Sequence, residues 1–247
     1  MKDQIANLLV KYLEARGVEH MFGLCGHTNI AVLAALSKSQ KIRFINTRHE
    51  QIAAHAADGY ARATKKASVL LSHLSPGLTN AATGVANASL DSIPMVVIAG
   101  DVPTHYYGKH PHQEVNLHAD ASQMEIYRPF VKRAWRVDSP HLFPEILEKA
   151  FQLAESGRPG PVLVDVPMDI FSKEIDSELF DRQLTNSRNV ARPSLDEEAA
   201  EMIVRQLLQA KTPLLYVGGG ILLADAATEM REFAEHLQIP VAHSLMG

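Results

Sequence analysis

The segment RHEQIAAHAADGYAR occupies residues 48–62 and places a carboxylate, Glu50, at the start of an alanine-rich helix. It directly follows residues 42–46, a short apolar run of the kind that forms a buried strand. On position alone, a glutamate in the first turn of a helix complements the helix macrodipole and usually has no further role. The small side chains from Ala53 to Gly59 additionally predict close packing of this helix, either in the core or across a subunit interface.

Outward from this segment, the first 170 residues alternate short apolar runs with longer helical stretches. The predicted strands are 21–24, 42–46, 68–73, 95–99, 134–137 and 162–166, and the predicted helices are 29–37, 50–64, 78–91 and 142–156, after an amphipathic helix near the N-terminus. Nearly continuous apolar strands that alternate with helices predict an α/β fold, a parallel sheet flanked by helices. Right-handed crossovers then bring the loops that follow the strands to one edge, where ligands bind.

The chain is predicted to have three parts. Residues 1–171 form the first domain, and the polar, mixed-charge stretch 172–193 is interpreted as a linker. Residues 194–247 begin a second, Rossmann-like α/β domain, in which Ser194 and Glu197 have capping-box spacing ahead of a helix. Two strands and two helices cannot bury both faces of a sheet. We therefore expect this second domain to be incomplete, and the chain to be a fragment or to continue.

Composition narrows the class of protein. With 247 residues, 46% of them hydrophobic and 21% charged, the chain has ordinary globular values, and its net charge of -4 shows no basic patch for nucleic acid. Its one cysteine, Cys25, excludes an internal disulfide and fits a reducing compartment. No apolar run approaches the roughly 20 residues that cross a bilayer. We expect a cytoplasmic protein without a membrane partner.

Several motifs in chain order resemble one enzyme family. Residues 48–62 resemble the "RHE…A..AA.GYAR" signature of thiamine-diphosphate enzymes of the acetolactate synthase and decarboxylase group. The further resemblances are residues 75–80 to the "GPG..N" loop, 91–103 to "D..P...I.G..P", 112–115 to the "FQE" loop, 129–132 to "P..K", and 158–167 to "GRPGPV…D.P". The ordered set covers nearly the whole of residues 1–170, which makes it more specific than any single motif. The first domain is therefore similar to the pyrimidine-binding domain of these enzymes.

The resemblance implies roles for individual residues on the cofactor side. In the family, the glutamate at the position of Glu50 hydrogen-bonds a ring nitrogen of the cofactor's aminopyrimidine and thereby activates the cofactor. This chemistry needs a carboxylate in an apolar, water-poor setting, and the alanines around Glu50 suit it. The resemblance also implies cofactor-binding roles in the neighbouring loops, for Gly26, Pro76, Gly77 and Asn80.

On the substrate side, Gln113 resembles a residue that faces the substrate. His27 is either a proton relay, as in some carboligases and lyases of the superfamily, or a helix-start residue bonded to backbone. Lys132 either lines the channel or is a solvated surface charge. Three positions depart from the acetolactate synthase pattern, with Cys25 for a proline, Ser75 for a glycine and His112 for a phenylalanine. Because these changes touch substrate-side loops, pyruvate as the substrate stays open.

The resemblance also implies the partners of the site. The substrate is expected to be a small 2-oxo acid or an aldehyde, and the cofactor thiamine diphosphate. The family holds Mg²⁺ and the diphosphate through a "GDG…N" motif in a C-terminal domain; this chain has no such motif, and we predict no metal ligands within it. Since the family's active site lies between two subunits, we expect a homodimer or homotetramer, and no activity from this segment alone. The middle domain of relatives binds FAD, binds another nucleotide or is empty, so FAD is an open alternative.

Other functions stay open on the sequence. The chain could be a non-catalytic fragment or degenerate relative that serves as a binding or assembly module. A nicotinamide or flavin enzyme of Rossmann type is disfavoured, because the first strand is not followed by the required glycine spacing. A transition-metal site is the less favoured interpretation of His105, His110, His112, His118, Glu114 and Asp120, because their spacing matches no standard zinc motif. Cys25 as a nucleophile has no identifiable partner base.

Overall fold

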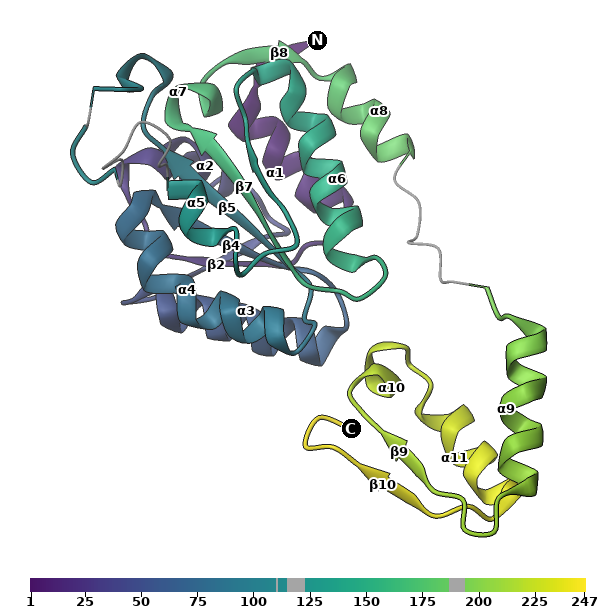
Figure 1. The fold of residues 1–247 in the computed structure, drawn as a ribbon. Helices are drawn as coiled ribbons and strands as arrows, with labels where there is room; N and C mark the ends of the chain where they lie inside the picture. Colours follow the sequence, from purple (N-terminus) through teal and green to yellow (C-terminus); the bar gives the residue numbers. More distant parts are fainter. Residues whose placement is uncertain (110, 115–122, 187–193) are drawn as a thin grey trace. The chain divides into compact units, whose positions relative to one another are not determined.

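A computed structural model of the chain describes residues 1–109, 111–114, 123–186 and 194–247 (Figure 1). The chain forms two compact units, Met1–Ala191 and Arg192–Gly247. Within the described residues, no helix is long and apolar enough to cross a membrane.

Among the described residues, six strands of the first unit form one sheet in which every neighbouring pair is parallel, in the order β3-β2-β4-β5-β7-β6. The strands are β2 (His20–Gly23), β3 (Arg43–Asn46), β4 (Ser68–His73), β5 (Met95–Asp101), β6 (Ala134–Arg136) and β7 (Pro161–Pro167). Every residue of β5 and β7 is buried, as the continuous apolar runs predict for inner strands covered on both faces. The predicted α/β fold with a parallel sheet is confirmed.

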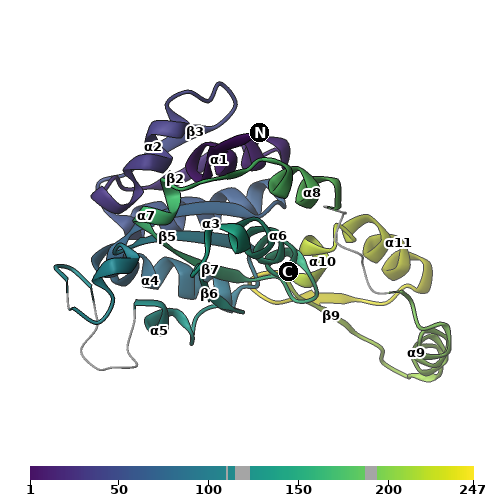
Figure 2. The same ribbon diagram turned by 90° about the horizontal axis from the view of Figure 1, so that it is seen from above.

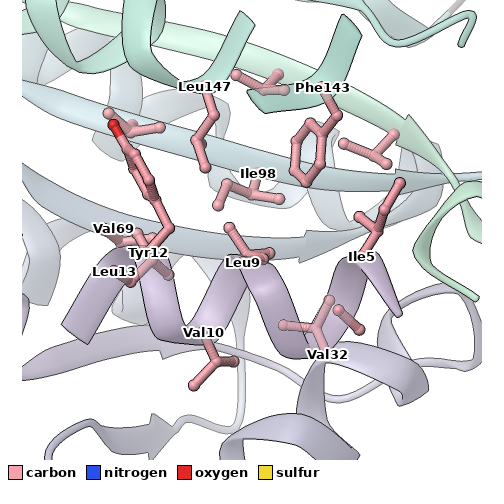
Figure 3. Close-up of a cluster of buried hydrophobic side chains, with 14 of the residues drawn as sticks. Ile5, Leu9, Val10, Tyr12, Leu13, Val32, Val69, Ile98, Phe143 and Leu147 are labelled. Atoms are coloured by element: carbon pink, nitrogen blue, oxygen red, sulfur yellow. The ribbon is translucent and has the colours of Figure 1, made fainter. Parts of the chain in front are cut away.

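Helices cover both faces of this sheet (Figures 1 and 2). One face carries α1 (Ile5–Ala15), α2 (Ile30–Leu36), α6 (Phe143–Glu155), α7 (Met168–Phe171) and α8 (Glu178–Asn186); the other carries α3 (Glu50–Thr64), α4 (Leu74–Leu90) and α5 (Gln123–Tyr127). The larger core lies under the first group, where Leu9 of α1 and Leu147 of α6 meet Ile98 of the sheet (Figure 3). Short 3₁₀ turns are η1 (His27–Asn29), η2 (Thr104–Tyr106) and η3 (Pro140–Leu142).

Helices α3 and α4 lie side by side on the opposite face (Figure 1). A Cβ placed on Gly84 of α4 would lie 2.5 Å from Cβ of Ala54 in α3, which is closer than two carbon atoms can approach. Ala53, Ala54 and Ala57 are fully buried. The predicted close packing of the alanine-rich helix is thus confirmed at these positions, where the partner is α4 of the same chain.

The structure differs from the predicted linker over part of residues 172–193. Strand β8 (Glu174–Asp176) pairs antiparallel with β1 (Lys2–Gln4), and α8 follows it. Ile175 of β8 is 1% exposed, and Phe180 of α8 is 2% exposed and packs edge-on against Phe143. Leu179 and Leu184 of α8 pack against the same core. This segment therefore belongs to the first unit, and residues 187–193 of the predicted linker lie outside the described residues.

The second unit contains α9 (Glu197–Gln209), β9 (Leu215–Val217), α10 (Gly220–Leu223), α11 (Ala227–Leu237) and β10 (Val241–His243). Strands β9 and β10 are parallel, as expected for the start of an α/β domain. The predicted capping box at Ser194 and Glu197 is wrong. The N-cap of α9 is Asp196, whose carboxylate accepts a 3.1 Å hydrogen bond from the backbone N–H of Ala199.

Candidate active site

The candidate site lies at the carboxyl edge of the sheet, where β2, β3 and β4 end. Three segments begin there: the loop after β2 with Gly26 and His27, the start of α3 with Glu50, and the first turns of α4. Because β2 lies between β3 and β4 in the sheet, these segments are spatial neighbours although they are separated in sequence. This is the edge at which open α/β sheets bind ligands.

Glu50 is the first residue of α3 and is 6% exposed. His49 caps the helix, since its Nδ1 accepts a 3.2 Å hydrogen bond from the backbone N–H of Gln51. The side chain of Asn80 donates a 2.9 Å hydrogen bond to Glu50 Oε2. The other oxygen, Oε1, is 3.5 Å from the point where a Cβ on Gly77 would stand. One carboxylate oxygen thus has a fixed donor, and the other faces bare backbone.

The first turn of α4 keeps this side of Glu50 uncovered. A Cβ on Gly77 would lie 2.7 Å from Ser72 Oγ, so a side chain at this position would force its neighbours to move. The helix begins at Leu74, which has a left-handed φ of 49°, so Pro76 and Gly77 lie inside its first turn and not in a preceding loop as predicted. Pro76 is exposed there, at a position where its missing N–H costs no helical hydrogen bond.

His73, the last residue of β4, is a member of the site that the sequence interpretation missed. Its Nδ1 is 2.8 Å from Thr28 Oγ1, and its ring meets the ring of His27 nearly edge-on at 4.6 Å between centroids. A Cβ on Gly26 would lie 2.1 Å from Cγ of His73, so the loop after β2 rests directly on this ring. The sequence did offer one indication of this role: His73 is the last residue of the predicted strand 68–73, which ends at the edge of the sheet where ligands bind.

Burial is the main cause that lowers the pKa of His73 below its usual 6.5, and the neighbouring His27 lowers it further. Gln113 and the negative charge of Glu50 raise the pKa of His73 without cancelling this shift. The imidazole of His73 is therefore neutral at pH 7, with one nitrogen that donates and one that accepts.

The structure thus brings the predicted residues together in two adjoining groups. Glu50, Gly77 and Asn80 form the first group. Gly26 and His27 lie against His73 in the second group, and Gln113 and the charge of Glu50 raise the pKa of His73. At Gly26 the observed close approach is to His73; an approach to the cofactor's pyrimidine stays a prediction.

A buried polar network lies between α5, the sheet and the loop after β5. Gln123 of α5 donates a 2.6 Å hydrogen bond to Asp165 Oδ1 and accepts one of 3.3 Å from Ser75. Beside it, Arg136 pairs with Asp101 at 2.9 Å and donates to Tyr107. Burial first, and the neighbouring Asp101 next, raise the pKa of Asp165. Ser75, Asp101 and Asp165 lie in the quoted family motifs, and here they tie α4, β5 and β7 to α5, to β6 and to the loop after β5.

Three weaker predictions have different outcomes. Lys132 is an exposed residue that donates to the carbonyl oxygens of Leu153 and Ser156 at the end of α6, which agrees with a surface charge; the channel role stays a prediction. Within the described residues, no group of three or more histidine, cysteine or acidic side chains could hold a metal ion, while His110, His118 and Asp120 of the predicted cluster lie outside those residues. Cys25 is an exposed free cysteine in the loop after β2.

The fold and this site agree with the comparison to protein families. The family described as "Thiamine pyrophosphate enzyme, N-terminal TPP binding domain" matches residues 3–124, and "Thiamine pyrophosphate enzyme, central domain" matches residues 200–247. The chain therefore belongs to the thiamine pyrophosphate enzymes, and both family matches follow the order of its two units.

Within this family, the chain is similar to acetolactate synthases. It is 41% identical over 247 residues to the acetolactate synthase of Arthrospira platensis, which covers 97% of this chain and 41% of the relative. The acetolactate synthase large subunit of Corynebacterium glutamicum is 40% identical over 243 residues, covering 98% and 38%. The chloroplastic acetolactate synthase of Arabidopsis thaliana is 39% identical over 244 residues, covering 98% and 35%. The chain thus spans about two fifths of the length of the curated relatives it matches.

Proposed function

We propose that this chain supplies the aminopyrimidine-binding half of the active site of a thiamine-diphosphate-dependent enzyme that joins or decarboxylates 2-oxo acids, with Glu50 as the residue that activates the cofactor. One observation carries the proposal: a buried carboxylate, oriented by Asn80 at 2.9 Å, turns its second oxygen toward the bare backbone of Gly77. Such a group can share a proton with a ring nitrogen at a place from which bulk water is largely excluded.

The residues present suit the aminopyrimidine chemically. Glu50 would hold the proton at a ring nitrogen, Asn80 would keep the carboxylate in one orientation, and Gly77 and Gly26 would let backbone approach the ring. When bound, thiamine diphosphate supplies the carbon nucleophile and electron sink that no protein side chain provides. His27 lies against the ring of His73, and we assign this side of the site, together with Gln113, to the substrate.

The remaining parts of the proposed enzyme lie outside the described geometry. Similarity to acetolactate synthases supports a carboligase activity, with a 2-oxo acid or aldehyde as substrate. We propose that Mg²⁺ and the diphosphate are held by a C-terminal domain, that the active site forms between two subunits of a homodimer or homotetramer, and that the enzyme is cytoplasmic. FAD in the central domain is a separate proposal, tested by the visible absorbance of the purified protein.

The test uses the full gene product that contains this chain. Thiamine diphosphate is titrated in the presence of Mg²⁺, and consumption of a panel of 2-oxo acids beginning with pyruvate is followed in wild type, Glu50→Gln and the control Glu145→Gln, whose side chain is 52% exposed on α6. We expect Glu50→Gln to lose roughly 100-fold or more in turnover, as general acid–base groups do, with cofactor affinity retained. The control should match wild type.

Two results would contradict the proposal. Equal turnover in wild type and Glu50→Gln would remove the assignment of Glu50. A folded wild-type protein that binds no thiamine diphosphate would favour the alternative, a non-catalytic binding or assembly module.

A further inference from the structure

We propose that Thr28 and His73 are positioning residues that hold the imidazole of His27 on the substrate side of the site, where His27 passes a proton to the substrate. This inference rests on the proposed function and adds two residues to which that function gave no role. It is carried by a row of contacts that runs outward from the sheet: Gly100 against Thr28, Thr28 on Nδ1 of His73, and the ring of His73 against that of His27.

Thr28 is fixed to the sheet at the inner end of this row. Its side chain is 1% exposed, and a Cβ on Gly100 of β5 would lie 2.3 Å from Thr28 Oγ1. Asn29, which is fully buried, closes the same turn, because its Oδ1 accepts a 3.0 Å hydrogen bond from the backbone N–H of Gly26 and its Nδ2 donates one of 3.2 Å to a backbone carbonyl of the loop. The backbone that carries His27 is therefore held by two buried neighbours.

The hydroxyl of Thr28 determines the tautomer of His73. A buried hydroxyl needs an acceptor for its proton, and within the described residues Thr28 Oγ1 has its hydrogen-bond partner in Nδ1 of His73, at 2.8 Å. The neutral ring therefore accepts at Nδ1 and carries its own proton on Nε2. A Cβ on Gly26 would lie 2.1 Å from Cγ and 2.4 Å from Cδ2 of this ring, so the adjacent backbone leaves the ring little room to turn.

His27 lies at the outer, exposed end of the row. Its ring meets the ring of His73 nearly edge-on, with 4.6 Å between the centroids and an interplanar angle of 70°. An exposed side chain keeps its rotamer freedom unless a partner holds it, and His73 supplies that contact. Within the part of the chain that the structure describes, neither ring nitrogen of His27 forms a hydrogen bond, so both can meet a ligand.

An imidazole in this place suits the proposed reaction. When the carbonyl carbon of a 2-oxo acid or an aldehyde is attacked, its oxygen gains negative charge and needs a proton. Protonated His27 would give that proton to the oxygen and be reprotonated from solvent, to which its side chain is exposed. A proton donor that is held in one orientation before the substrate arrives loses less conformational freedom when it reacts.

The first experiment does not depend on turnover. The cofactor-free full gene product is treated above pH 7 with diethyl pyrocarbonate, which modifies neutral imidazoles, and the rate of modification of His27 is measured by mass spectrometry of its peptide. We expect a rate about 2- to 10-fold higher in Thr28→Val and in His73→Leu, because the ring of His27 loses its support. Thr28→Ser keeps the hydroxyl and should react at nearly the wild-type rate.

The internal control is His141, an exposed histidine of η3, which should be modified at one rate in all four proteins. An unchanged rate for His27 in both Thr28→Val and His73→Leu would overturn the proposal. An equal increase at His141 would show a general loosening of the fold and would overturn it too.

The second experiment is a double-mutant cycle in the loaded enzyme with the 2-oxo acid that wild type turns over fastest. We expect His27→Gln and His73→Leu each to lower kcat about 3- to 100-fold, and His73→Leu to add little to the loss in a protein that already carries His27→Gln. Thr28→Val should lower kcat in the same way, and Thr28→Ser should restore most of it. Multiplicative effects, or a loss confined to thiamine diphosphate affinity, would show a merely structural role and overturn the proposal.

The failure of the proposed function would be seen separately. A turnover of Glu50→Gln equal to wild type would contradict that function, and the modification rate of His27 would then remain as the test of the contacts that Thr28 and His73 make.

Discussion

Asn80 of α4 and Glu50 of α3 are joined by a 2.9 Å hydrogen bond, from Asn80 Nδ2 to Glu50 Oε2. The two residues are 30 positions apart in sequence, and the close packing of α3 on α4 brings them together. One carboxylate oxygen of Glu50 therefore already accepts a hydrogen bond within the protein. The packing of α3 on α4 and the hydrogen bond from Asn80 orient the candidate proton partner.

Asn80→Ala should therefore lower activity without unfolding the protein. Asn80 itself is exposed, but its acceptor Glu50 is buried, so we expect the unfolding free energy to fall by about 1–3 kcal/mol while the protein stays folded. Loss of one hydrogen bond to a charged group, about 1.5–3 kcal/mol, corresponds to roughly 10- to 100-fold in turnover if the bond orients Glu50 in the reaction. Turnover and thermal unfolding of the same preparation separate the two effects. Wild-type turnover in Asn80→Ala would show that this hydrogen bond is dispensable.

The packing of α3 on α4 makes a second prediction, with a matched pair of glycines. Gly84→Ala should destabilise the protein by about 1–3 kcal/mol, because the new Cβ would lie 2.5 Å from that of Ala54. Gly59→Ala is the control: it lies inside α3 with nothing within 4 Å of its Cβ position, and should stabilise by about 0.5–1 kcal/mol. Denaturant unfolding measures both, and equal effects would contradict the close approach of the helices.

A pH prediction follows from His73. Its folded-state pKa lies below the unfolded value near 6.5, so the neutral ring favours the folded state. This stability is fully present above the unfolded pKa and is lost as the pH falls through the folded pKa. Wild type should therefore lose more unfolding free energy than His73→Gln on acidification from about pH 7 to pH 5. Parallel curves for the two proteins would show that His73 is not held neutral by the fold.

The contribution of the buried pair Asp101 and Asp165 to the unfolding free energy should depend on pH in the opposite sense. The folded-state pKa of Asp165 is raised, first by burial and then by Asp101, so its contribution is present below the unfolded pKa and lost as pH rises through the folded pKa. Asp165→Asn should thus flatten the decline of stability with rising pH, measured by denaturant unfolding. Asp101→Asn should instead destabilise, because it takes the charged partner of Arg136 away. Identical pH curves for wild type and Asp165→Asn would contradict this account.

Local sequence patterns predicted the helices and strands that are determined by residues close together in the sequence. Helix 50–64 and strand 68–73 were predicted to the residue, because continuous apolar runs and alanine-rich periodicity are visible in sequence. Strand β8 was not predicted, because Ile175 is its single buried residue and its partner strand β1 lies at the opposite end of the first unit in sequence. Pairing between distant segments leaves no local signature.

The residues of the candidate site also divide into those that the sequence predicts and those that only the fold brings together. Glu50 was found because its helix carries a family signature, whereas His73 stands outside every quoted motif. Its contacts are with Thr28, which is 45 positions away, and with the ring of His27 in the loop after β2. The fold places these residues at one edge, and only the folded geometry reveals which of them touch.

The central claim, that Glu50 activates a bound thiamine diphosphate, is tested most directly without any substrate. The full gene product is loaded with thiamine diphosphate and Mg²⁺, and the rate of deuterium exchange at the reactive thiazolium carbon is measured in wild type and Glu50→Gln. We predict exchange at least about 100-fold slower in Glu50→Gln at equal cofactor occupancy. Equal exchange rates in the two loaded proteins would contradict the account.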